Sequence, residues 1–137
     1  MSEEKPAVVQ EADAIYESVR AICHDSGTHP APTVYRVLGN LKGATGPMLA
    51  QALNQLADGL VRSLDEYEVY QDDGSDPILN VAAAAGHMRL AAQLAAQLGE
   101  QLSEAQNAIA GQCYRDWTPV HADGGGLVAL GPFQTPD

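Results

Sequence analysis

Apolar residues recur three and four positions apart along most of the chain. The earliest run consists of Val8, Ala12, Ile15, Val19 and Ile22. Its spacings of 4, 3, 4 and 3 place these side chains on one face of a helix. We expect this helix to begin at Ala7, directly after Pro6, and to end near Asp25, because glycine and proline follow. Residues 1–6 are then a polar leader.

Two longer periodic runs follow, separated by an acidic turn. The first consists of Leu49, Leu53, Leu56, Leu60, Leu64 and Tyr67. The second consists of Val81, Ala85, Met88, Ala91, Ala95, Leu98, Leu102, Ala105 and Ile109. Asp76 is the predicted N-cap of the second helix, Pro77 is its first residue, and the helix is expected to reach about Gln112. Two long helices joined by a short turn favour an antiparallel hairpin.

Between the first helix and this hairpin lies the stretch VLGNLKGATGPML, which contains three glycines. We expect a short helix over Val34–Leu41 that ends at Gly43, and a second helix capped by Thr45 or Gly46. The spacing of these glycines fits neither the P-loop nor the dinucleotide-binding fingerprint. The stretch therefore predicts a corner between helices, with an anion site at the second helix start as the alternative.

Together these patterns predict an all-α fold: an antiparallel helical hairpin within an up-and-down bundle of three to four helices. The first helix and the short helix are expected to cover the exposed stripe of the hairpin. The bundle domain spans residues 7–117, and residues 118–137 form an extended, Gly- and Pro-rich tail. The apolar sequence LVAL in this tail is a candidate short strand.

The charge of the chain narrows the classes of partner. Eighteen acidic residues face seven basic ones, and the net charge is −11. This balance argues against direct binding to nucleic acid or to anionic membranes, since both need Lys and Arg. The N-terminus does not resemble a signal peptide, and no apolar run approaches a membrane span, so we expect a cytoplasmic protein. The bias toward Ala, Gly and Asp favours a bacterial source.

Residues with chemical reactivity are few and scattered. The weak candidates for a metal site are Cys23, His24, Cys113 and His121. Their positions match no zinc-binding spacing, and isolated cysteines in a cytoplasmic protein are reduced by default, so we expect neither a metal nor a cofactor. No signature of a hydrolase, transferase or di-metal bundle is present. We therefore expect no enzymatic activity.

The remaining interpretation is a helical interaction protein. We expect an oligomerising adaptor, a regulator or a component of a larger assembly, with a protein partner and a homo-oligomeric, coiled-coil-like association. The predicted interface residues are Leu53, Leu56, Leu60, Leu94, Leu98 and Leu102 in the hairpin, and Leu127, Val128, Leu130 and Phe133 in the tail. Two alternatives stay open: a small regulator that binds a ligand or metal, and an acidic inhibitor that mimics nucleic acid toward a basic partner.

Overall fold

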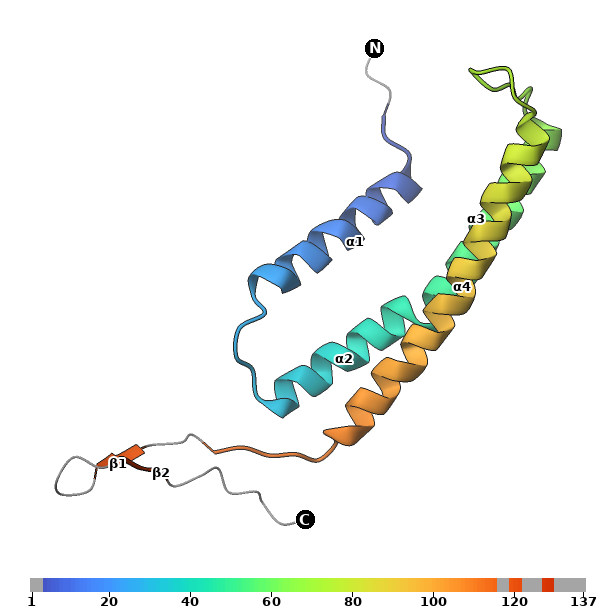
Figure 1. The fold of residues 1–137 in the computed structure, drawn as a ribbon. Coiled ribbons are helices and arrows are strands. Elements are labelled where there is room, and N and C mark those ends of the chain that lie inside the picture. The colour runs from blue at the N-terminus through green and yellow to red at the C-terminus, as the bar shows by residue number, and fades with distance from the viewer. Residues whose placement is uncertain (1–3, 116–118, 122–126, 130–137) are drawn as a thin grey trace. The chain divides into compact units, whose positions relative to one another are not determined.

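A computed structural model of the chain describes residues 4–115, 119–121 and 127–129 (Figure 1). The described residues form four helices and two short strands. The chain divides into two compact units, residues 1–30 and residues 31–137, and each is described by itself. This division falls inside the range 7–117 that the sequence predicts as one bundle domain.

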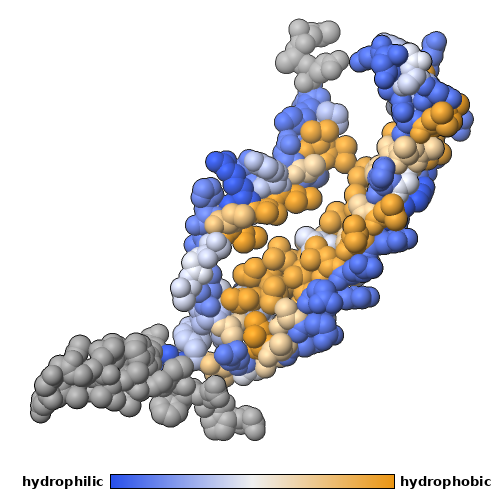
Figure 2. Space-filling model, in the orientation of Figure 1, coloured by the Kyte–Doolittle hydropathy of each residue, from blue (hydrophilic) through white to orange (hydrophobic). Residues whose placement is uncertain are grey.

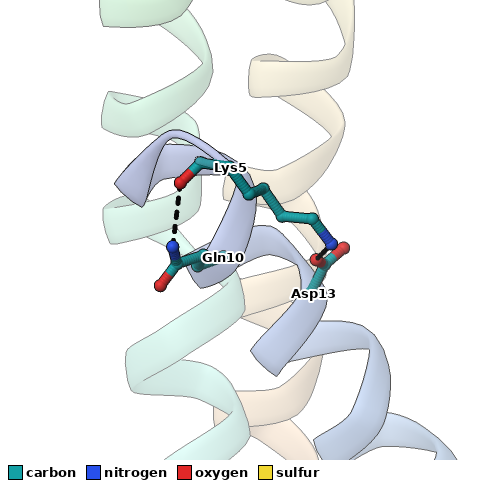
Figure 3. A network of polar contacts seen from close by, with 3 residues as sticks. All are labelled: Lys5, Gln10 and Asp13. Carbon is teal, nitrogen blue, oxygen red and sulfur yellow. Dashed lines mark hydrogen bonds and ion pairs between the residues drawn. The ribbon is translucent and has the colours of Figure 1, made fainter. Parts of the chain in front are cut away.

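The first unit is built around α1 (Ala7–His24). Pro6 occupies the N-cap position and provides no side-chain cap. The preceding residue ties the leader to the helix instead: the Lys5 ammonium contacts a carboxylate oxygen of Asp13 at 2.8 Å, and the Gln10 amide donates to the Lys5 carbonyl at 2.8 Å (Figure 3). The helix has the predicted bounds, and none of its residues is buried.

The second unit contains three helices that pack against one another: α2 (Ala31–Thr45), α3 (Pro47–Glu66) and α4 (Pro77–Ala108). Contacts at two points along each helix define their directions. Pro47 and Asp58 of α3 lie against Gly99 and Arg89, while Gly39 and Gly46 at the α2 side lie opposite Gln106 and Gly99. Residue numbers on α4 thus fall as those on α2 and α3 rise. Both helices therefore run antiparallel to α4 and follow one another along it (Figure 1).

Three helix boundaries differ from the prediction, and the first is the start of the short helix, which begins at Ala31 and not at Val34. The short helix does not stop at Gly43 but continues to Thr45, because its backbone hydrogen bonds continue up to the Gly46 N–H, which donates to the Lys42 carbonyl at 3.0 Å. The last long helix ends at Ala108, not at Gln112. Ile109 is its C-cap, and Gly111 takes a φ of 77°, a left-handed value that no α-helix can contain.

The predicted start signals of the two long helices are confirmed. Gly46 is the N-cap residue of α3 and Pro47 follows in its first turn. At the other helix, the Asp76 carboxylate accepts a hydrogen bond of 2.9 Å from the backbone N–H of Ile78, and Pro77 occupies the first turn. The acidic turn between them spans residues 67–76 and sets the hairpin.

Two short strands are described in the tail, β1 (Pro119–His121) and β2 (Leu127–Ala129). They pair antiparallel, with Val120 opposite Val128. The expected strand within LVAL is confirmed by β2, whereas β1 was not anticipated.

The fold class is therefore all-α, with a helical bundle as its main body, as predicted. Three helices form the packed bundle. That the first helix covers the hairpin stays a prediction. Among the described helices, none combines the length and apolar content that a membrane crossing requires.

Candidate interaction surface

The seam of the bundle is lined by small side chains. The buried apolar residues of the described chain are Ala57, Ala85, Ala92 and Ala95. On α4 the buried positions Ala85, Ala92, Gly99 and Gln106 recur every seven residues, which is about two helical turns. Each buried CH₂ gains only about 0.8 kcal/mol, so an alanine seam stabilises the bundle far less than a leucine seam of equal length.

The glycines of the corner serve this seam. A Cβ atom at Gly46 would lie 3.0 Å from the Gly99 Cα, and a Cβ at Gly99 would lie 2.9 Å from the Gly46 Cα. The backbones of the α2–α3 corner and of α4 therefore cross in direct contact, which only paired glycines permit. The predicted corner at Gly46 is thus supported by an observed contact.

Gly39 leaves room for a polar contact across the same seam. The nearly buried Gln106 amide donates to the Tyr35 carbonyl at 3.1 Å and accepts from the Lys42 ammonium at 3.1 Å. A Cβ at Gly39 would lie 2.7 Å from the Gln106 Nε2. Both polar ends of the amide are therefore satisfied, as burial requires. The sequence interpretation missed Gln106, because its seven-residue spacing from Gly99 carries information only once the burial of Gly99 is known.

A shallow groove of about 600 Å³ lies beside the glycine crossing. Its walls are Lys42, Gly43, Pro47 and Met48 on one side and Ala96, Gly99, Glu100 and Ser103 on α4. The ammonium of Lys42 already bonds to Gln106 outside this lining. The groove arises where the glycines lack side chains, and its lining is mostly apolar.

The structure divides the six predicted interface leucines of the hairpin into two groups. Leu53, Leu60 and Leu102 are half-buried and contribute to the packing of the unit itself. Leu56, Leu94 and Leu98 are exposed, with 48%, 64% and 45% of their surface accessible. Leu90, which was not predicted as an interface residue, is 55% exposed and belongs with the second group.

Large exposed apolar residues are frequent throughout the described chain. No large side chain among the described residues is fully buried. On α1, six apolar residues are between 41% and 67% exposed: Val8, Val9, Ile15, Tyr16, Val19 and Ile22. In Figure 2 apolar side chains form a band along α1 and a patch over the bundle helices. Contiguous exposed apolar patches are typical of surfaces that bind another protein.

The candidate metal ligands lie in separate parts of the chain. Cys23 and His24 end α1, and Cys113 follows α4. Both cysteines are free and exposed, and the Cys113 thiol contacts the Gly111 carbonyl. His121 belongs to β1, where side chains are not described. Within the described residues, no group of three or more His, Cys, Asp or Glu is placed to hold a metal ion.

The tail candidates are only partly covered by the structure. Leu127 and Val128 lie in β2, whose backbone alone is described, and Leu130 and Phe133 fall outside the described residues. Comparison with known proteins adds no assignment: no family model matches the chain, and no curated protein or solved structure is significantly similar to it.

Proposed function

We propose that the protein is a non-catalytic helical interaction protein that associates with further copies of itself, as an adaptor or a component of an assembly. The observation that carries this proposal is the poor burial of large apolar side chains. The buried apolar residues of the described chain are alanines, while α1 and the bundle helices leave leucine, isoleucine, valine and tyrosine side chains accessible.

Physical chemistry favours covering these faces. Full burial of a valine, leucine or isoleucine side chain gains about 1.5–3 kcal/mol, and each of the two units, taken by itself, realises little of this gain. A domain of this size that does not bury its large apolar residues is marginally stable alone. Association buries the same surfaces without any change in fold.

Self-association should stabilise the folded chain, so that its unfolding temperature depends on protein concentration, and this dependence can be tested. Thermal unfolding of the full chain is followed by far-ultraviolet circular dichroism at concentrations that span about two orders of magnitude. The unfolding midpoint is expected to rise with protein concentration, because the associated state binds copies of the folded chain and not of the unfolded one. A midpoint independent of concentration would contradict the proposal.

A further inference from the structure

One exposed face of α4 has a sequence pattern of its own. It consists of seven exposed residues, here called the Leu94 stripe: Ala83, His87, Leu90, Leu94, Leu98, Gln101 and Ala105. On a helix of 3.6 residues per turn these positions fall within about 80° of arc. The stripe lies about 140° around the helix from the buried alanine and glycine positions. It is therefore separate from the seam with α2 and α3.

The Leu94 stripe contains no Asp, Glu, Lys or Arg side chain. The charged residues of α4 are Arg89, Glu100 and Glu104, and all three project from another sector of the helix. The whole chain carries a net charge of −11, so two copies repel at most orientations. This face allows a second copy to approach without placing carboxylates against one another.

The spacings within the stripe are symmetric about its central residue, and the residue types match at each pair of positions except His87 and Gln101. Its spacings are 4, 3, 4, 4, 3 and 4, and Leu94 is the central residue. Leu90 and Leu98 are equally far from this centre, and so are His87 and Gln101. The outermost pair is Ala83 and Ala105. A two-fold interface requires a patch that is complementary to itself, and this arrangement meets that requirement.

We infer that two copies of the chain pair antiparallel through this stripe, with a two-fold axis at Leu94. Leu94 then contacts its own counterpart, and Leu90 packs level with Leu98 of the second copy. The polar pair His87 and Gln101 meets near each end, and the alanines let the helix ends approach closely. This inference rests on the proposed function and assigns one face and one geometry to the self-association.

The area of the stripe sets the expected strength of the pair. The stripe is about 33 Å long, and a helix is about 10 Å wide, so each copy contributes roughly 300–400 Å². A standard stable interface buries about 800 Å² per partner, so this pair belongs to the weaker class. We expect a dimer that dissociates in the micromolar range.

The first test replaces the central leucine. Leu94→Glu places two carboxylates on the axis, and the dimer dissociation constant measured by sedimentation equilibrium is expected to rise at least about a hundredfold. Gln93→Glu is the matched control, since it adds the same charge to the neighbouring exposed position in the charged sector and should leave the constant unchanged. Circular dichroism of both variants verifies that the helices are retained.

The second test examines which stripe residues lie opposite each other in the dimer, and it uses no variant that destabilises the pair. In a chain with Cys23→Ser and Cys113→Ser, Leu94→Cys should form a disulfide between copies under mild oxidation. Leu90→Cys alone should not form this disulfide. The cysteines at position 90 of the two chains would lie about 12 Å apart along the helix direction, and a disulfide needs Cα atoms within about 7 Å. A mixture of Leu90→Cys and Leu98→Cys chains should cross-link to each other.

The outcomes separate this inference from the proposed function. If Leu94→Glu associates as strongly as the unaltered chain, or if Leu90→Cys cross-links to itself as readily as Leu94→Cys, the Leu94 pairing is wrong while self-association stands. If the unaltered chain stays monomeric and its unfolding midpoint is independent of concentration, both proposals are wrong. Loss of the dimer in Leu94→Glu but not in Gln93→Glu, together with the cross-linking pattern, supports the inference.

Discussion

At the residue scale, the contact between Gly46 and Gly99 sets how closely the α2–α3 corner approaches α4. The two Cα atoms face each other so closely that a methyl group on either would lie about 3 Å from the opposite backbone. Backbone cannot rotate away as a flexible side chain can, so the helices must separate to admit the methyl group. Overpacking at this crossing would therefore destabilise the chain more than the higher helix propensity of alanine would stabilise it.

This contact predicts opposite effects for two alanine substitutions in α4. Gly86 faces open space, so Gly86→Ala should stabilise the chain by up to about 1 kcal/mol through helix propensity. Gly99→Ala gains the same propensity but overpacks the crossing, and should be less stable than Gly86→Ala by about 1–3 kcal/mol. Urea unfolding of both variants measures the difference, and equal stabilities would mean that the crossing is not close.

Gln106 shows what the sequence could not reveal at this scale. Its amide side chain is only 9% exposed and joins α4 to the Tyr35 carbonyl and the Lys42 ammonium. A glutamine near the end of an acidic helix is ordinarily a surface residue. Its burial depends on Gly39 lying opposite, which is a property of the register between two helices.

At the element scale, the periodic apolar runs predicted most of the helices. The bounds of α1, the cap at Asp76 and the start of α3 follow from local signals: apolar spacing, a proline in the first turn and a capping carboxylate. The predicted end of α2 was wrong, because the helical backbone hydrogen bonds continue past Gly43. Which leucines face inward could not be predicted, since this depends on how neighbouring helices are rotated.

The turn before α4 makes a prediction about pH. The Ser75 hydroxyl and backbone N–H both donate to the Asp73 carboxylate, at 2.7 and 3.0 Å, and these bonds lower the pKa of Asp73 below its ordinary value of 3.8. Because the pKa of Asp73 is lower in the folded turn than in the unfolded chain, its bonds to Ser75 stabilise the folded state above about pH 4. This stabilisation is lost as the pH falls through the folded-state pKa of Asp73.

Ser75→Ala removes the hydroxyl donor, which is the largest cause of the shift. The pKa of Asp73 is therefore expected to rise toward 3.8 in this variant. Carboxyl ¹³C chemical shifts followed by NMR between about pH 2 and pH 6 measure both values. An unchanged pKa would show that the hydroxyl bond is absent in solution.

At the scale of the whole molecule, the described helices fully bury none of their large side chains. The bundle of α2, α3 and α4 meets through alanine and glycine, and the leucines of the Leu94 stripe remain accessible. The α1 unit, described by itself, also exposes a continuous apolar face. The sequence predicted an interaction protein from these runs, and Leu94 and Leu98 were among its interface candidates. The symmetry of the stripe emerged only once the exposed leucines were known.

Sedimentation equilibrium of the full, unaltered chain tests this account most directly. The measurement covers chain concentrations from about 1 µM to about 1 mM, the range over which a micromolar dimer forms. If the chain self-associates, its average mass rises with concentration from that of one chain to at least that of two. A mass that stays at the value of a single chain across the whole range would contradict it.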